Sequence, residues 1–151
     1  MLQKGDKAPD FKLESTEVKV VSLKDFKGKN VVLYFYPKDN TPGCTTEACS
    51  FRDNIDAFSE KDTVILGVSP DKIASHHKFI DKQGLNFPLL SDPEHVAAEA
   101  YGAWGEKSMF GKKYMGIIRS TFVIDKTGKI VEAFYKVKVK GHTEEVLANL
   151  V

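Results

Sequence analysis

An unbroken apolar run, Val31 to Tyr36, is followed by a loop that contains Pro37 and Pro42 and then by a stretch with helical periodicity. Consecutive β-branched and aromatic residues are typical of a strand that is buried on both faces of a sheet, as in α/β proteins. From Cys44 onward, apolar side chains recur at positions 44, 48, 51, 55 and 58, which is the spacing of one helical face. The chain is therefore expected to fold around a buried strand, a short loop and a helix.

The chain has only two cysteines, Cys44 and Cys49, and both fall in this predicted helix. Cys44 lies at the helix N-terminus, where unpaired backbone N–H groups and the helix dipole favour the reactive thiolate. Two Cα atoms five positions apart in an intact α-helix are separated by ~8.6 Å. A disulfide needs Cα atoms within roughly 7 Å. We therefore predict that a bond between Cys44 and Cys49 requires the first turns of the helix to unwind.

The cysteine spacing by itself leaves open whether the two thiols are reactive or simply part of the core. The spacing CxxxxC differs from the CxxC of thioredoxin-like reductases and of common zinc sites. None of the histidines has ligand spacing to the cysteines, so no metal site is expected; they are His76, His77, His95 and His142. No Gly-x-Gly-x-x-Gly motif follows a strand, so neither a nicotinamide nor a flavin cofactor is expected.

Pro37, Thr41 and Cys44 form the pattern Pro-x-x-x-Thr-x-x-Cys, which resembles the active-site signature of peroxiredoxins. The longer segments 34–49 and 114–125 resemble the bacterioferritin comigratory protein, or peroxiredoxin Q, subfamily, and the resemblance extends over essentially the whole chain. It implies a thiol peroxidase that reduces hydrogen peroxide and alkyl hydroperoxides, and thus a role in antioxidant defence and redox homeostasis.

The resemblance also implies a division of labour between the two cysteines. Cys44 is expected to attack the peroxide and to become a sulfenic acid, and Cys49 to resolve that acid as an intramolecular disulfide before it is oxidised further. Regeneration then needs an external dithiol, which the resemblance identifies as thioredoxin or a similar reductant. Because resolution requires no second subunit, a monomer is expected.

Four further residues receive roles from the same resemblance. The hydroxyl of Thr41 can hydrogen-bond to the peroxide and the thiolate, and Pro37 shapes the loop and shields the pocket. Arg119 precedes the apolar run 121–124, and its rigid, permanently charged guanidinium can stabilise the thiolate and the charge on the reacting oxygens. Glu47, three residues after Cys44, can accept a hydrogen bond from Arg119 and orient it.

Composition agrees with one ordinary globular domain over residues 1–151. The 22 basic and 21 acidic residues nearly cancel, so neither nucleic acid nor a membrane is expected as a partner. No apolar stretch approaches the ~20 residues of a membrane span, and the first residues lack a signal-peptide core. Thiols that must be re-reduced then predict a cytoplasmic location, and a mature organellar form is the alternative.

The remaining patterns predict an α/β fold with a central mixed sheet flanked by helices and an N-terminal β-hairpin. The resemblance implies that this is a thioredoxin-like fold. The expected hairpins comprise residues 11–13 with 18–21 and residues 121–124 with 129–135. The expected strands are 63–69 and 89–90, and the expected helices are a turn at 22–26, then 73–83, 96–101 and 143–149, the last with Thr143 as its cap. Residues 136–140 are expected to form a strand or extended edge with solvated lysines. Residues 102–116 are predicted to be a long aromatic loop, either packed on the surface or lining the peroxide pocket or reductase-docking face.

Two other functions stay open at the level of sequence. A thioredoxin-like disulfide reductase is disfavoured by the CxxxxC spacing and by Pro37 and Thr41. A redox-sensing binding protein could transmit the state of Cys44 through unwinding of the helix. Peroxide turnover with a thioredoxin system distinguishes them, because a sensor needs oxidation but not rapid recycling.

Overall fold

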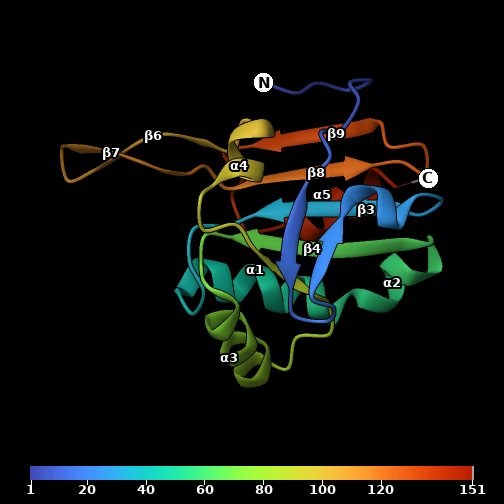
Figure 1. Ribbon diagram of the computed structural model, residues 1–151, viewed down its shortest axis with the longest axis horizontal. Coiled ribbons are helices and arrows are strands. Elements are labelled where there is room, and N and C mark those ends of the chain that lie inside the picture. Colours follow the sequence, from blue (N-terminus) through green and yellow to red (C-terminus); the bar gives the residue numbers. More distant parts are fainter. Residues whose placement is uncertain (151) are drawn as a thin grey trace.

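The computed structural model describes residues 1–150, which fold around a central mixed β-sheet. The strands of this sheet are β1 (Lys12–Ser15), β2 (Val20–Ser22), β3 (Asn30–Phe35), β4 (Thr63–Ser69), β5 (Leu89–Ser91), β8 (Ser120–Ile124) and β9 (Ile130–Tyr135). They lie in the order β2-β1-β5-β4-β3-β8-β9 (Figure 1). β3, β4 and β5 are parallel to one another, and the remaining pairs are antiparallel.

Helices cover both faces of the sheet (Figure 1). One face carries α1 (Pro42–Asp53), α2 (Ile55–Glu60), α3 (Ile73–Gln83) and α5 (His142–Ala148). The other carries the 3-10 helix η1 (Leu23–Phe26) and α4 (Val96–Ala100). This arrangement confirms the predicted fold class. None of the described helices is long and apolar enough to cross a membrane.

β3 lies inside the sheet between β4 and β8, and all six of its residues are buried. Val32 and Tyr34 point into the core under α1 and α3, whereas Leu33 and Phe35 point into the core on the opposite face. Buried side chains on both faces explain why the run lacks an alternation of polar and apolar residues. The predicted strand is confirmed with a shift of one residue, and Tyr36 lies buried just beyond its end.

The predicted helix that carries positions 44 to 58 is divided at Asn54 into α1 and α2. The other predicted elements are confirmed with small shifts of their ends, except at three places. α5 begins after Gly141, and Thr143 lies buried inside the helix, with its hydroxyl 2.6 Å from that of Ser50. The prediction that Thr143 caps α5 was therefore wrong. The stretch Lys136–Lys140 forms no strand, although its three lysines are exposed as expected.

The third correction concerns residues 102–116, which are not a loop but a two-stranded hairpin of β6 (Trp104–Met109) and β7 (Lys112–Ile117). We call this hairpin the β-arm, and it projects from the body of the protein (Figure 1). Its two-residue turn, Phe110 and Gly111, has positive φ at both positions, as type I′ turns require. The sequence pattern did not reveal the arm because most of its residues are exposed on both faces, so burial imposes no alternation.

Candidate active site

Cys44 lies in the first turn of α1, where the loop that leaves β3 enters the helix. Pro42 is the first helical residue, a position where the missing N–H of proline has no intrahelical partner to lose. The side chain of Cys44 is buried and its sulfur is not in a disulfide. The Nη2 group of Arg119 donates to Cys44 Sγ at 3.2 Å. A cation and the start of a helix thus both face this sulfur, and both favour its thiolate form.

Sheet topology explains how Arg119 reaches a cysteine 75 residues away in sequence. β8 pairs antiparallel with β3, and Ser120 lies opposite Phe35. Arg119, one residue before Ser120, therefore lies at the carboxyl end of β3, where the loop to α1 begins. This is the edge at which open α/β sheets commonly carry their sites.

Arg119 also binds Glu47, which lies one helical turn after Cys44 on the same buried face of α1. Its Nη1 group donates to Glu47 Oε1 at 2.6 Å. A Cβ atom at Gly43 would lie 3.3 Å from Arg119 Nη2, so glycine at this position leaves room for the guanidinium. The predicted contact between Glu47 and Arg119 is present.

Burial and the mutual attraction of Glu47 and Arg119 together determine the pKa values of these two residues. The side chain of Glu47 is 1% exposed, and burial raises its pKa to about 7, although the charge and hydrogen bond of Arg119 act in the opposite direction. Its second oxygen, Oε2, is buried without a hydrogen-bond partner. Burial alone would lower the pKa of Arg119, but Glu47 and Cys44 raise it overall, so the guanidinium stays cationic.

Thr41 and Pro37 lie on the loop that leads into α1. The hydroxyl of Thr41 donates to the carbonyl of Lys38 at 2.8 Å and leaves its oxygen lone pairs free to accept another donor. Thr41 occupies the cap position of α1 without a capping side-chain bond. Pro37 follows the buried Tyr36 and is itself half-buried. Both residues belong to this loop, residues 36–41, which we call the cysteine loop, whereas Arg119 is in direct contact with both Cys44 and Glu47.

Cys49 lies further along α1, which is continuous to Asp53, and it too is free. Its half-buried sulfur lies 3.7 Å from Gln83 Oε1, at the end of α3, and faces that helix. Both cysteines therefore belong to one intact helix, as the sequence predicted.

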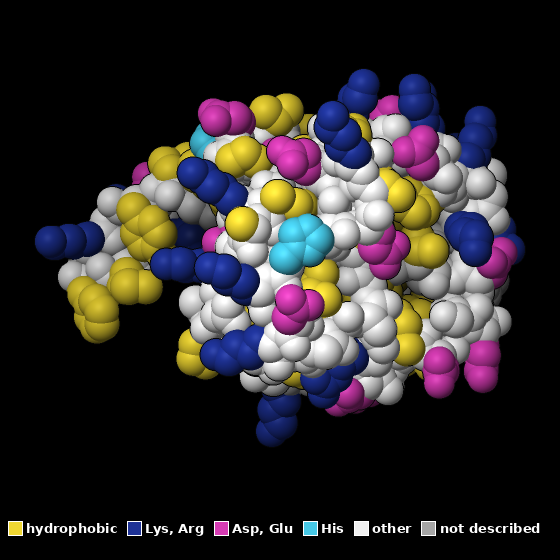
Figure 2. Space-filling model, turned by 60° about the horizontal axis from the view of Figure 1, so that its bottom comes forward, with side chains coloured by type: hydrophobic (Ala, Val, Ile, Leu, Met, Phe, Trp, Pro, Cys, Tyr) yellow, Lys and Arg dark blue, Asp and Glu magenta, His cyan; other side chains and the backbone are white. Residues whose placement is uncertain are grey.

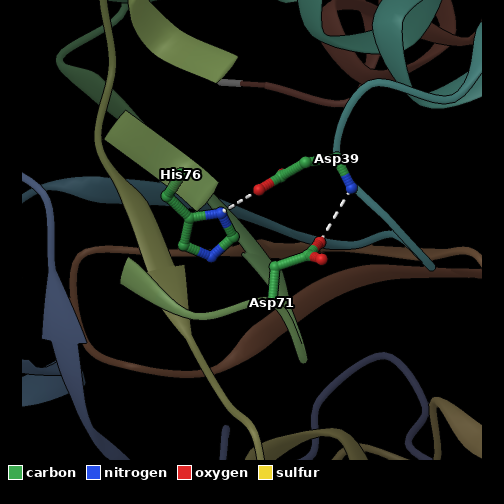
Figure 3. Close-up of side chains that lie close together, drawn as sticks. All are labelled: Asp39, Asp71 and His76. Atoms are coloured by element: carbon green, nitrogen blue, oxygen red, sulfur yellow. Dashed lines mark hydrogen bonds and ion pairs between the residues drawn. The ribbon is translucent and has the colours of Figure 1, made fainter. Parts of the chain in front are cut away.

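Sequence reasoning missed a set of buried and half-buried polar residues that anchors the cysteine loop (Figure 3). The backbone N–H of Asp39 donates to Asp71 Oδ2 at 2.7 Å. The carboxylate of Asp39 accepts hydrogen bonds from Tyr36 Oη at 2.6 Å and Ser75 Oγ at 2.8 Å, and its Oδ2 lies 2.8 Å from His76 Nδ1. Asp39 lies within the predicted motif, but His76 is 37 residues away, so spacing gave no signal for the pair.

Within residues 1–150, Asp39, Asp71 and His76 form the group of side chains close enough to share a metal ion, with ligand atoms within 4.8 Å of one another. The oxygens that face the centre already accept hydrogen bonds, and His76 Nε2 lies 2.9 Å from the carbonyl of Leu90. That carbonyl can only accept, so Nε2 carries a proton. Burial raises the pKa of Asp39, but the hydrogen bonds from His76 and Tyr36 outweigh this and lower it. The geometry is that of a hydrogen-bonded anchor.

Comparisons with known proteins show which proteins this chain resembles. The AhpC/TSA family matches residues 4–133. Peroxiredoxin Bcp of Bacillus subtilis is 56% identical over 146 residues, which cover 97% of this chain and 93% of that protein. A solved structure of a PrxQ mutant from Xylella fastidiosa has a TM-score of 0.92 at 41% identity and covers 98% of this chain and 94% of its own. The Xanthomonas campestris bacterioferritin comigratory protein, whose structures were described for its alkyl peroxide reduction activity, has a TM-score of 0.87 at 43% identity, covering 91% of this chain and 88% of its own.

Proposed function

The chain belongs to the AhpC/TSA family, in its peroxiredoxin Q/Bcp branch of thiol peroxidases, and on that premise we propose that Cys44 is the residue that attacks the peroxide. The contact between Arg119 Nη2 and Cys44 Sγ, at 3.2 Å and next to the start of a helix, carries the proposal. The Cys44 thiolate attacks one peroxide oxygen, so an S–O bond forms as the O–O bond breaks. The sulfur is oxidised to a sulfenic acid, and the departing oxygen takes up a proton to leave as water or an alcohol.

Arg119 has two proposed roles in this step. Its charge stabilises the thiolate before the attack and the negative charge on the departing oxygen during it. Glu47 holds the guanidinium in place through Nη1, which leaves Nη2 directed at the sulfur. Thr41 borders the approach to Cys44 with a hydroxyl that can accept from the peroxide, and Pro37 contributes no N–H to the loop and keeps water away from it.

Cys49 is proposed to resolve the sulfenic acid. Its sulfur attacks the sulfur of Cys44, a disulfide forms, and the sulfenic oxygen leaves as water. Because both residues lie in the continuous helix α1 and Cys49 faces α3, the first turns of α1 must unwind for the two sulfurs to meet. Amide exchange of residues 44–52 should therefore be faster in the oxidised than in the reduced protein, and equal protection would contradict this step.

The disulfide is returned to two thiols by an external dithiol through a mixed disulfide. We propose thioredoxin or a similar reductant in the cytoplasm, and a monomeric enzyme, because both cysteines of the cycle belong to one chain. Hydrogen peroxide and alkyl hydroperoxides are the proposed substrates. The alkyl peroxide reduction activity described for the Xanthomonas campestris relative supports the second class.

The test compares the unmodified protein with Cys44→Ser and Cys49→Ser in peroxide consumption driven by thioredoxin and its reductase. Both variants should lose turnover, while Cys49→Ser should still consume about one equivalent of peroxide as Cys44 becomes a sulfenic acid. Full turnover by Cys44→Ser would overturn the proposal. Stoichiometric oxidation without recycling in the unmodified protein would instead favour the redox-sensing alternative.

A further inference from the structure

The tip of the β-arm exposes a group of apolar side chains. Phe110, the first residue of its turn, is 98% exposed, and Met109 and Met115 are each 55% exposed. Tyr114 is exposed as well. Figure 2 shows hydrophobic and lysine side chains gathered on this projection, at the left of the view. Exposed apolar side chains that are grouped in this way mark an interaction site.

The backbone at Phe110 indicates that this residue does not serve the fold. Its φ of 52° lies in the left-handed region, which bulky residues rarely adopt. Turns of this type favour Asn or Asp before Gly, because those residues tolerate a positive φ. Phenylalanine is unfavourable at this position, and at 98% exposure it gains no burial within the chain in return. Strain without a compensating contact in the protein itself points to a functional contact outside it.

The arm begins beside the active site and extends away from it. At its base, the backbone N–H of Ile118 donates to the carbonyl of Ala103 at 2.7 Å. Arg119 follows directly and is in contact with Cys44. β6 has six residues, so it extends about 20 Å from this base to the turn (Figure 1). Phe110 is therefore too far from Cys44 to line the peroxide pocket, which leaves a docking face as the remaining interpretation of these apolar residues.

The charge of the arm limits which partners fit it. Residues 104–117 contain three lysines and one acidic residue, Glu106, which pairs with Lys113 at 3.6 Å. Lys112 is exposed at the tip, directly opposite Met109. A second copy of the chain would bring two basic arms together, and repulsion between like charges disfavours that contact. A protein with acidic residues around an apolar patch is complementary to this surface.

The proposed catalytic cycle requires one macromolecule at this edge of the protein. The disulfide between Cys44 and Cys49 is reduced to two thiols as an external dithiol is oxidised to its own disulfide. That dithiol must reach the sulfurs that become accessible when the first turns of α1 unwind. Because Arg119 joins the base of the arm to the start of α1, a protein that reaches these sulfurs lies next to the arm.

We propose that the β-arm is the docking surface for the protein dithiol that re-reduces the enzyme, with Phe110, Met109 and Met115 as the apolar contacts and Lys112 facing acidic residues of the partner. The inference rests on the proposed function, in which an external dithiol recycles the disulfide. Exposed aromatic and methionine side chains suit this role, since both are enriched in protein interfaces and methionine adapts its shape to a partner. The arm thus serves recycling, whereas the attack on peroxide takes place in the body of the protein.

The test measures peroxide turnover as a function of the concentration of thioredoxin and, separately, of dithiothreitol. Phe110→Ala should raise the KM for thioredoxin about tenfold, the loss expected for one central interface residue. Lys112→Glu should raise this KM about threefold, and added salt should reduce the difference. Turnover with dithiothreitol should be unchanged in both variants, because a small dithiol needs no docking surface. The matched controls, Val18→Ala and Lys19→Glu, alter exposed residues between β1 and β2 and should leave both KM values unchanged.

An unchanged KM for thioredoxin in both Phe110→Ala and Lys112→Glu would overturn the inference. If the unmodified protein, but not Phe110→Ala, also sedimented with vesicles of phosphatidylglycerol, the arm would belong to a lipid surface instead. An unmodified protein that turns over with dithiothreitol but with neither thioredoxin nor glutaredoxin would likewise refute the docking surface.

The dithiothreitol assay separates these failures from a failure of the proposed function. If the unmodified protein does not turn over even with dithiothreitol, the proposed cycle of Cys44 and Cys49 is wrong, and the inference falls with it. Normal turnover with both reductants, together with variants that are insensitive, refutes only the role of the β-arm.

Discussion

Replacement of Glu47 by glutamine should change how the stability of the protein depends on pH. Glu47 is 1% exposed, donates nothing, and leaves Oε2 without a partner, so its carboxylate is stabilised chiefly by one bond from Arg119. Burial outweighs this bond and raises the pKa of Glu47 from 4.5, its ordinary value, to about 7. Glutamine retains an oxygen that can accept from Arg119 but cannot ionise.

The magnitude follows from the two pKa values. Below pH 4.5 the carboxyl is protonated in both the folded and the unfolded chain, so its full contribution to stability is present. Between pH 4.5 and 7 the unfolded chain ionises while the folded protein does not, and this contribution is lost as the pH rises through the folded pKa. Each pKa unit between the folded and the unfolded value corresponds to ~1.4 kcal/mol in the free energy of unfolding. Over this interval the unmodified protein should therefore lose about 3 kcal/mol of stability relative to Glu47→Gln.

The assay is equilibrium unfolding in urea, under reducing conditions, at intervals from pH 4.5 to pH 8. The quantity of interest is the difference in the free energy of unfolding between Glu47→Gln and the unmodified protein, because ionisable groups common to both cancel. This difference should grow in favour of Glu47→Gln as the pH rises and should level off above pH 7. A difference that stays constant would show that Glu47 is ionised in the folded protein throughout, and that attraction to Arg119 outweighs the cost of burial.

Three further predictions address the loop anchor, the core and the space around the guanidinium. The pKa of Asp39 is lowered in the folded protein, so the stability that its carboxylate contributes is present above ~4, its pKa in the unfolded chain, and is lost as the pH falls through the folded pKa. Asp39→Asn should therefore be less stable than the unmodified protein at pH 6 but should lose less stability on acidification, and equal losses in urea unfolding would contradict this. Phe51 is 0% exposed and its ring stacks on that of Tyr34, with 4.8 Å between the ring centroids, so Phe51→Ala should lower the free energy of unfolding by ~3–5 kcal/mol. The control is Phe110→Ala, at a side chain that is 98% exposed, which should change the free energy of unfolding by no more than ~0.5 kcal/mol. The added methyl of Gly43→Ala would lie 3.3 Å from Arg119 Nη2, so the guanidinium must move and peroxide reduction should slow by ~3–10-fold in stopped-flow measurements, with an unchanged rate counting against the assigned contact.

Local sequence patterns determined the elements whose burial follows a regular period. The apolar run of β3 and the helix over residues 73–83, with Gly84 in the left-handed conformation at its end, lie where the sequence predicted them. The helical stripe that begins at Cys44 is also present, although Asn54 divides it between α1 and α2. In each case, residues at a regular spacing along the chain are buried together, so burial produces an apolar pattern in the sequence. The contact between Arg119 and Glu47 was expected only through a resemblance, because local spacing says nothing about residues 72 positions apart.

The tertiary structure decided what depends on distant parts of the chain meeting. The pairing of β3 with β8 brings Arg119 to Cys44, and the packing of α3 beside the cysteine loop brings His76 to Asp39. The raised pKa of Glu47 arises from its burial in the folded protein. The sequence alone does not show whether a given aspartate or glutamate will be buried or exposed. The β-arm was missed for the opposite reason. A hairpin exposed on both faces is stabilised by backbone hydrogen bonds between its strands and by its turn. Neither requires apolar residues at a regular spacing, so the sequence shows no periodic pattern there.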